Sequence, residues 1–288
     1  MIDQAVLERL EADAEASLSG NTGIALDVLG YGEISTVLRA EGLDGPVAAK
    51  RLPAMTGEQL SEYKEILARY LDDLRARGIR PVDSEVFSVG SDPYTPYCVQ
   101  PLLPLLLVDE LRTADRETVD YRVEQLVGIV VGAVDGWLGL DGQISNWGVD
   151  GDELLYVDVT TPLLRDASGK DQLDTDLFIA SLPWALQGSV RRFLLDEILS
   201  HYYDPRAVLL DMAGNLVKER LFQVMEPLLR ATNQVLSPPI TTDEAMRYYR
   251  TDARMWELLQ RLRQADRWWQ KTARHRVYPF LLPGEIER

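Results

Sequence analysis

The spacing of apolar residues changes at two prolines, Pro101 and Pro104, and this change constrains the fold more than any other feature of the chain. Before the prolines, glycines divide short apolar runs, which predicts β-strands. After them, apolar residues recur at helical spacing, which predicts helices. Since prolines stiffen the backbone and interrupt sheets, the pair marks a boundary between two lobes. We therefore expect an α+β chain with a sheet-containing lobe in residues 1–100 and a mostly helical lobe in residues 101–288.

The first lobe is expected to start with an acidic amphipathic helix and to continue with five strands, the first three in an antiparallel meander. One main helix separates the third strand from the fourth; Thr56 can cap it and Gly78 ends it. The expected strands are 24–29, 35–40, 46–52, 85–89 and 97–102, and the helix is 56–77.

The second lobe should open with a long buried helix, followed by two short strands and then by helices almost throughout. The expected helices are 118–138, 190–203, 205–218, 221–236 and 242–271, and the strands are 144–149 and 154–159.

The composition narrows the class of protein. A formal net charge of −16 argues against nucleic acid as the main partner, because neutralising phosphates takes Lys and Arg. The single cysteine, Cys98, rules out an internal disulfide framework, and two histidines leave little for a His-rich metal site. No apolar run is long enough to span a bilayer, and no signal peptide is recognisable. A reducing, cytoplasmic location is the simplest inference.

Residues 247–276 oppose the acidic trend, with nine Lys or Arg against three Asp or Glu. The same stretch holds Trp256, Trp268 and Trp269 at helix-compatible intervals. We expect a helix whose aromatic face packs on the body of the protein while its arginines pair with acidic neighbours. Contact with a membrane or a polyanion is the alternative.

Several residues in the first lobe could bind an anion. Gly30 and Gly32 lie in a tight turn between two expected strands, where glycines let backbone N–H groups approach phosphate oxygens. Lys50 lies within the third strand among apolar neighbours, where it either meets an anion or points outward. Glu62 or Glu65 on the following helix could pair with Lys50, and Glu62 is favoured because it lies nearer the buried stripe.

The stretch DGQISN supplies Asp141 and Asn146, and Asp158 follows in YVDVTTP. Three oxygen-bearing side chains of this kind could hold a divalent metal and activate a hydroxyl group. They could equally be ordinary turn residues. The informative feature is the order: glycine hairpin, strand lysine, helix glutamate, connector, long apolar helix, D-x4-N and then a strand-end aspartate.

In this order the chain resembles the protein-kinase-like superfamily, and more closely its small-molecule branch, the aminoglycoside and choline phosphotransferases. The family's Gly-x-Gly-x-x-Gly-x-Val loop corresponds to GYGEISTV at 30–37, and its Val-Ala-x-Lys strand to VAAK at 47–50. Its catalytic-loop Asp and Asn resemble Asp141 and Asn146, and the Asp of its metal-binding motif resembles Asp158. The resemblance extends over roughly residues 24 to 162.

The resemblance implies a two-lobed protein-kinase-like fold and transfer of phosphate from ATP, with Mg²⁺, to a hydroxyl of a small molecule. The acidic charge favours a cationic acceptor. Asp141 would be the catalytic base, and Asn146 and Asp158 would bind the metal. The residues implied to bind the nucleotide are Gly30, Gly32, Ser35 and Val37 of the loop, Lys50 held by Glu62, and Gln100 and Leu102 of the connector segment 100–103, whose backbone would contact adenine.

The chain departs from the family pattern at several positions. Ser35 replaces the third glycine of the loop, and Gly139 replaces the histidine that supports the catalytic loop. Gln143 stands where the family has a cation, so one stabiliser of the transferring phosphate is absent. Asp158 is followed by Val159 and Thr160 in place of Phe and Gly.

These departures leave two alternatives open: a pseudokinase that binds nucleotide or acts as a scaffold through its helical lobe, and a kinase-like site that runs another reaction. A second copy of the chain or a partner protein could bind the helical lobe. Hydrolase, zinc and dinucleotide motifs are absent. The pairs Tyr202-Tyr203 and Tyr248-Tyr249 could line a substrate cleft, although such pairs more often belong to the core.

Overall fold

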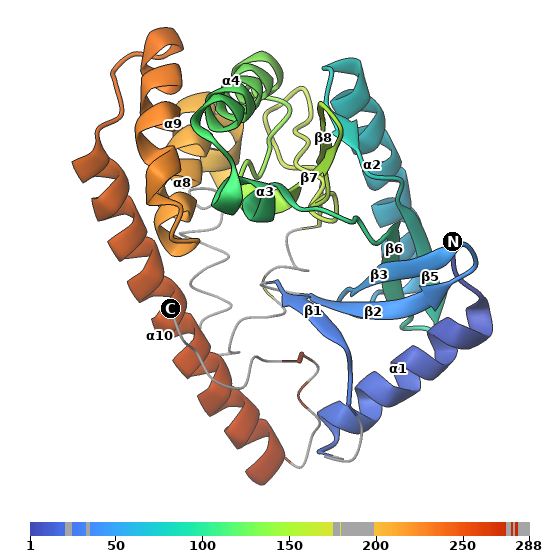
Figure 1. Ribbon diagram of the computed structural model, residues 1–288. Coiled ribbons are helices and arrows are strands. Elements are labelled where there is room, and N and C mark those ends of the chain that lie inside the picture. Colours follow the sequence, from blue (N-terminus) through green and yellow to red (C-terminus); the bar gives the residue numbers. More distant parts are fainter. Residues whose placement is uncertain are drawn as a thin grey trace.

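A five-stranded antiparallel sheet and a group of long helices make up most of the protein, as the computed structural model shows (Figure 1). The structure describes residues 1–20, 25–32, 35–174, 179, 199–274, 278, 280 and 281. The strands follow the order β1-β2-β3-β6-β5 across the sheet. They are β1 (Val28–Tyr31), β2 (Thr36–Gly42), β3 (Gly45–Arg51), β5 (Glu85–Val89) and β6 (Thr95–Pro101). The predicted meander of the first three strands is confirmed.

Helix α1 (Gln4–Leu18) covers one face of this sheet. Successive side chains of a strand point to opposite faces, so Val47 and Ala49 of β3 pack toward α1, while Ala48 and Lys50 point away from it. The core on the α1 side consists of Ile2, Leu7, Leu38, Ala40, Val47, Ala49, Tyr97 and Val99. The opposite face of the sheet is therefore the one that can carry a polar site.

A buried polar cluster fixes α1 on the sheet. Arg51 donates to both carboxylate oxygens of Glu11, over 2.8 and 2.7 Å, and Tyr97 donates to the same carboxylate over 2.5 Å. Glu11 is buried, so its charge depends on these donors.

Helix α2 (Gly57–Ala76) packs on the other side and matches the expected helix closely. Thr56 caps it through a capping box with Gln59, as the sequence predicts for the cap. Its buried stripe consists of Leu60, Tyr63, Ile66, Leu67, Tyr70, Leu71 and Leu74. Directly after it, β4 (Arg80–Pro81), a strand that the sequence did not predict, pairs in parallel with β8 (Glu153–Tyr156) in a second sheet of order β4-β8-β7.

The connector leads into α3 (Leu107–Thr113), which the pattern missed, and then into α4 (Arg116–Ala133). The expected helix 118–138 ends early, because Val134 is extended and the side chain of Asp135 accepts hydrogen bonds from the amides of Trp137 and Leu138. The following hairpin consists of β7 (Trp147–Asp150) and β8, and the first residues of the expected strand 144–149 form a 3₁₀ turn, η1 (Ile144–Asn146).

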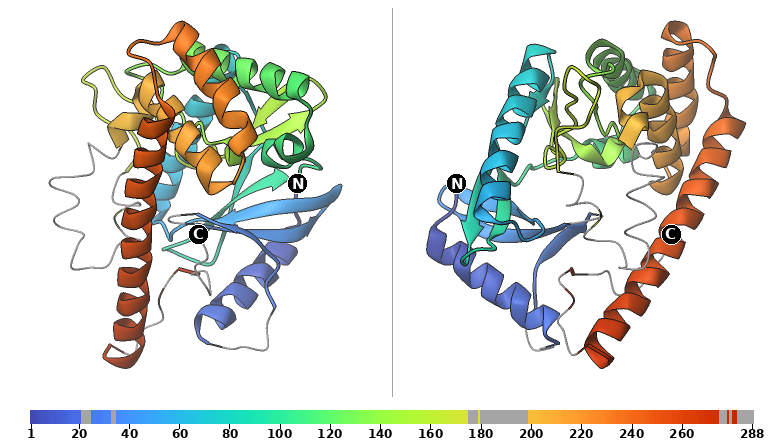
Figure 2. Two further views of the ribbon diagram at one scale, coloured as in Figure 1. Left: turned by 60° about the vertical axis from the view of Figure 1, so that its left-hand side comes forward. Right: turned by 180° about the vertical axis from the view of Figure 1, so that it is seen from behind.

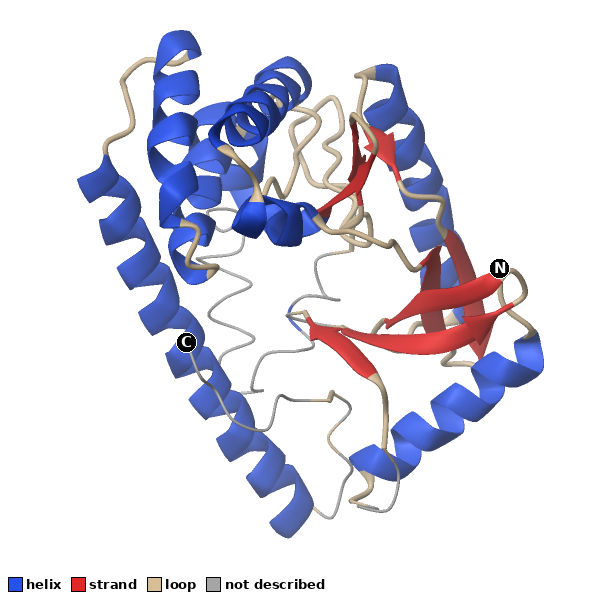
Figure 3. Cartoon of the chain, viewed as in Figure 1, coloured by secondary structure: helices blue, strands red, loops and turns tan. Residues whose placement is uncertain are grey.

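The remaining helices are α8 (Pro205–Lys218), α9 (Phe222–Val235) and α10 (Thr242–Thr272), all close to the predicted ranges. Figure 3 shows these helices apart from the five-stranded sheet. The helix expected at 190–203 lies largely outside the described residues, which show a 3₁₀ turn, η2 (His201–Tyr203), at its end.

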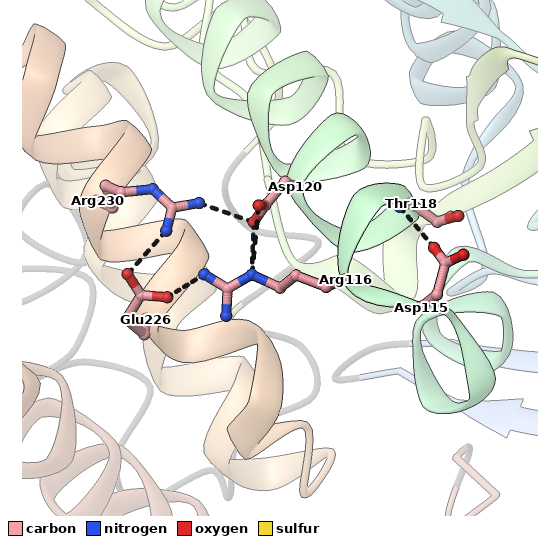
Figure 4. A network of polar contacts seen from close by, with 6 residues as sticks. All are labelled: Asp115, Arg116, Thr118, Asp120, Glu226 and Arg230. Carbon is pink, nitrogen blue, oxygen red and sulfur yellow. Dashed lines mark hydrogen bonds and ion pairs between the residues drawn. The ribbon is translucent and has the colours of Figure 1, made fainter.

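Four charged side chains join α4 to α9 (Figure 4). Arg230 pairs with Asp120 at 2.8 Å and with Glu226 at 2.9 Å. Arg116 pairs with Asp120 at 3.2 Å and also contacts Glu226, which closes the network. Asp115 caps α4 by accepting from the amide of Thr118.

One continuous apolar core extends across the expected lobe boundary. It includes Tyr70 and Leu74 of α2, Leu126 of α4, Leu216 of α8 and Leu228 of α9. Helix α2 thus packs against the helical part of the chain as well as beside the sheet.

Helix α10 differs from its expected packing. Its buried side chains include Gln260, Arg263 and Asp266, whereas Trp268 and Trp269 are 65% and 46% exposed. The expectation of an aromatic face packed on the body is wrong for these two tryptophans. No helix in the described ranges combines the length and apolar character needed to cross a bilayer.

Candidate functional site

Lys50 meets an anion on the face of the sheet opposite α1. Its ammonium group donates a hydrogen bond to Oδ1 of Asp158 over 2.7 Å. The two side chains are 19% and 26% exposed, so the ion pair is partly shielded from water. The structure therefore resolves the open question for Lys50: the side chain points inward, and the predicted phosphate-binding lysine contacts the predicted metal ligand.

The surroundings of Asp158 keep it ionised. Burial raises the pKa of this carboxyl, but the charge and hydrogen bond of Lys50 and hydrogen bonds from Thr160 outweigh burial and hold the pKa below its usual value. The hydroxyl of Thr160 donates over 3.2 Å. At such an ion pair, a phosphate could replace the carboxylate as the partner of the ammonium group, and a divalent cation could replace the ammonium group as the partner of the carboxylate.

The glycine turn lies next to Lys50 in the sheet. Val37 of β2 is the cross-strand neighbour of Lys50, and the amide of Gly32 donates to the carbonyl of Ser35 over 2.9 Å. A Cβ at Gly32 would lie 2.6 Å from Oγ of Ser35, whose side chain would have to rotate, whereas a Cβ at Gly30 would meet no atom within 4 Å. The tip of the turn, residues 33 and 34, lies outside the described residues.

The expected ion pair between Lys50 and Glu62 does not form. Glu62 and Glu65 are exposed, and neither carboxylate pairs with Lys50 in the described structure. Glu62 instead lines a cavity of about 720 Å³ beside the segment 165–174. The residue of α2 that faces the site is Tyr63, which donates to the carbonyl of Thr160 over 3.0 Å. The apolar stripe of α2 therefore turns the glutamates outward and brings a tyrosine inward.

Asp141 and Asn146 lie together in the loop before β7. The amide of Gln143 donates to the Asp141 carboxylate over 3.2 Å, and Nδ2 of Asn146 donates to the Asp141 carbonyl over 3.3 Å. The carbonyl of Asn146 accepts from the amide of Val157 over 2.9 Å, which brings Asn146 beside the residue that precedes Asp158. The three predicted oxygen-bearing residues therefore come from adjoining segments.

Two buried tyrosines, Tyr70 and Tyr156, lie within electrostatic range of both Asp141 and Asp158. Burial raises the pKa of both Tyr70 and Tyr156, and the negative charges of Asp158 and Asp141 raise the pKa of each further. Both aspartates thus act electrostatically on the same two hydroxyl groups.

Side chains from two helices hold the loop that carries Asp141. The hydroxyl of Tyr70 donates to the carbonyl of Gly139 over 3.1 Å. Asn215 of α8 accepts from the amide of Ile144 over 3.1 Å and donates to the side chain of Gln143 over 3.3 Å. Because these bonds are buried or partly buried, they fix the loop without the histidine that the resemblance led us to expect.

The missing histidine has a steric explanation. A Cβ at Gly139 would lie 3.0 Å from Cβ of Leu163 and 3.1 Å from both the carbonyl oxygen of Tyr202 and Cδ1 of Tyr203. The space beside Gly139 is filled by these residues, so a larger side chain there would force them to shift.

Asn146 and Asp158 suit a magnesium ion in donor type. Mg²⁺ prefers hard oxygen ligands and is usually held by one or two protein groups, with water and phosphate oxygens completing the shell. The described residues contain no group of three or more His, Cys, Asp or Glu side chains placed to hold a metal.

Several polar groups of the connector, residues 100–103, already make hydrogen bonds within the protein. The amide of Leu102 donates to the carbonyl of Pro46 over 3.1 Å, and Pro101 has no amide hydrogen. The side chain of Gln100 donates to the Val157 carbonyl over 2.9 Å and to Ser84 over 3.0 Å. Hydrogen bonds within the protein therefore already use these backbone and side-chain groups.

A second acidic region borders the loop on the side of α8 and α10. Tyr248 donates to Asp211 over 2.9 Å, and burial raises the pKa of this aspartate despite that bond. Gln143 also interacts with Asp211, which joins this region to the loop of Asp141. Burial raises the pKa of Tyr248, and three carboxylates nearby raise it further: Asp211, Asp252 and Asp141.

Sequence reasoning missed several of these groups, although a signal existed for some. Tyr63 and Tyr70 lie in the apolar stripe of α2, and Asn215 lies among Met212, Ala213 and Leu216 of α8. A polar atom on a face that will be buried requires a hydrogen-bond partner, so such residues are candidates for bracing a loop. The partner itself could not be read from the sequence, because it comes from a distant segment.

A family model described as a family of unknown function (DUF6206) matches residues 9–267. No curated protein matches the chain.

Proposed function

We propose that this chain is an ATP- and Mg²⁺-dependent phosphotransferase acting on a hydroxyl group of a small molecule. The chain belongs to a family of unknown function, DUF6206. The observation that carries the proposal is the contact between Lys50 and Asp158 beside the loop of Asp141 and Asn146. Lys50, which is far from the other three residues in the sequence, contacts Asp158, and Asp141 and Asn146 lie in the adjoining loop. Each of the four has the chemistry that phosphoryl transfer requires.

Phosphoryl transfer depends on positioning and charge neutralisation more than on covalent chemistry of the protein. Lys50 would exchange its bond to Asp158 for the phosphate oxygens of the nucleotide. Asp158, freed from Lys50, and Asn146 would then hold Mg²⁺, which when bound neutralises phosphate charge. The glycine turn at Gly30 and Gly32 would cover the phosphates with backbone amides.

Asp141 would accept the proton of the attacking hydroxyl group. Its carboxylate lies in a loop that Tyr70 and Asn215 hold from two sides. A base held in this way can meet an acceptor without reorganising the loop, which is the main contribution that a protein makes to such a reaction.

A cationic acceptor is favoured by the acidic region around Tyr248. Asp211 and Asp252 lie near this hydroxyl, and the charge of Asp141 acts on it as well. An amino group bound between these carboxylates would bring a hydroxyl on the same molecule toward Asp141.

A second candidate function is nucleotide binding without phosphotransfer. Lys50 pairs with Asp158 and with no glutamate of α2 in the described structure, and no cation stands at Gln143. Both features remove a group that positions or stabilises the transferring phosphate.

The experiment that tests the proposed function follows the nucleotide products formed from ATP with Mg²⁺ and a panel of hydroxylated amines. Production of ADP that depends on an acceptor, and is lost in Asp141→Asn, supports phosphotransfer. Asp152→Asn is the matched control, because Asp152 is an exposed aspartate in the β7–β8 turn. AMP in place of ADP would assign another reaction, and nucleotide binding without turnover would favour the second candidate.

A further inference from the structure

From Met255 onward, the side chains of helix α10 depart from the distribution expected for a helix on the surface of a protein. It buries Gln260, Arg263 and Asp266 and exposes large apolar side chains. The exposed ones are Met255 (64%), Leu258 (53%), Trp268 (65%) and Trp269 (46%). An exposed apolar patch of this kind marks a binding surface, because water contact with these side chains is unfavourable.

Arginines accompany the apolar side chains on the outward face of α10. Residues seven apart lie in one row along a helix, so Arg247, Arg254 and Arg261 form a row that ends at Trp268. Arg250 borders this row, and Leu258 and Met255 lie beside it. All four arginines are exposed.

Most of this positive charge is uncompensated. Arg261 pairs with Glu257. No ion pair joins Arg247, Arg250 or Arg254 to a carboxylate in the part of the chain that the structure describes. The expectation that the arginines of this helix pair with acidic neighbours is therefore not met at these three positions. A chain with a formal charge of −16 thus presents a positive face here, which selects an anionic partner.

We infer that the outward face of α10 binds the surface of a bilayer that contains anionic phospholipids. The helix has 31 residues and is therefore roughly 45 Å long. It lies along the margin of the molecule in two opposite views (Figures 1 and 2). A plane of headgroups above acyl chains offers anions to the arginines and an apolar layer to the tryptophans along its whole length.

Other anionic partners fit this face less well. Nucleic acid phosphates would neutralise the arginines, but a duplex backbone offers no apolar layer to Met255 and Leu258. A symmetric contact between two copies of α10 would place the row of arginines against itself, and like charges repel. The lipid surface satisfies both kinds of side chain together.

The test is flotation of the full chain with vesicles of phosphatidylcholine alone and of phosphatidylcholine with phosphatidylserine. Binding is expected only with phosphatidylserine and should weaken as salt is added. The variant Arg247→Glu, Arg250→Glu, Arg254→Glu should partition about a hundredfold more weakly, since each basic residue near an anionic surface contributes independently. The variant Trp268→Ser, Trp269→Ser should also lose binding.

The matched control carries the same charge change elsewhere: Arg9→Glu, Arg39→Glu, Arg69→Glu, three exposed arginines outside α10. Circular dichroism of each variant checks folding. Retention of binding in the control and loss in both α10 variants support the inference. Failure of the wild-type chain to float with phosphatidylserine vesicles overturns it. So does equal binding of all variants, a dimer that only the α10 variants dissociate, or binding to a DNA oligonucleotide in place of vesicles.

Discussion

Lys50 of β3 donates a 2.7 Å hydrogen bond to Asp158, a residue 108 positions later in the chain. This contact joins the sheet to the segment that follows the β7–β8 hairpin. It also places an ammonium group that could bind phosphate beside a carboxylate that could bind a metal. The contact is therefore both a structural link and the centre of the proposed nucleotide site.

The link should appear as a coupling energy. Lys50→Met and Asp158→Asn each leave one partly shielded partner unmatched, so each should lower the free energy of unfolding, while the double variant should lose less than the sum. We expect a coupling of about 1–2 kcal/mol, reduced by the partial exposure of both side chains. Urea unfolding of the four proteins measures it, and additive losses would show that the contact contributes nothing.

The ionisation of Asp158 should make this stabilisation dependent on pH. Its pKa is lowered in the folded protein, so the contribution is fully present above the unfolded value, about 4, and is lost as the pH falls toward the folded value. The difference in unfolding free energy between wild type and Asp158→Asn should therefore shrink as the solution is acidified below pH of about 4. A difference that stays constant across this range would contradict the prediction.

The close packing around Gly139, beside the loop that carries Asp141, leads to a prediction about stability. Gly139→Ala places a Cβ 3.0 Å from Leu163 and 3.1 Å from the Tyr202 carbonyl, so we expect a loss of about 1–3 kcal/mol in unfolding free energy. Gly128→Ala in α4 is the control, because a Cβ there meets no atom within 4 Å. That variant should be neutral or more stable by up to about 1 kcal/mol, since alanine favours the helix. Equal effects of both variants in a thermal unfolding experiment would refute the steric account of the missing histidine.

Asn215 should control the order of the Asp141 loop. Asn215→Ala leaves the buried amide of Ile144 without its acceptor, which costs about 1–3 kcal/mol and should speed hydrogen exchange in residues 139–147. Asn233→Ala is the matched control: Asn233 makes two hydrogen bonds to Ile240, far along the chain from the loop. Exchange in the loop that rises equally in both variants would mean that only global stability had changed.

Local patterns predicted most of the elements, for physical reasons that specific residues illustrate. Thr56 followed by Gln59 has the chemistry of a capping box, and the apolar stripe of α2 repeats at helical spacing, so both the start and the buried face of that helix could be derived. The alternation in β3 predicted a strand but left the direction of Lys50 open, because a period of two defines opposite faces without identifying the inner one.

The parts that failed depend on distant contacts or on competing local bonds. The helix expected to reach residue 138 stops at Ala133, because Asp135 bonds the backbone amides that follow it. Glu62 was expected inside, yet Tyr63 holds that position, because the stripe of α2 packs against the helical core as well as the sheet. β4 has only two residues and exists through pairing with β8, so its own sequence carries no strand pattern.

The central claim is a Mg²⁺-dependent nucleotide site at Lys50 and Asp158, and isothermal titration calorimetry of ATP with and without Mg²⁺ tests it most directly. We expect wild type and the control Asp152→Asn to bind ATP with Mg²⁺, Lys50→Met to bind at least about tenfold more weakly, and Asp158→Asn to lose the dependence on metal. Absence of binding by the wild-type chain, or binding that Asp158→Asn leaves unchanged, would contradict the account.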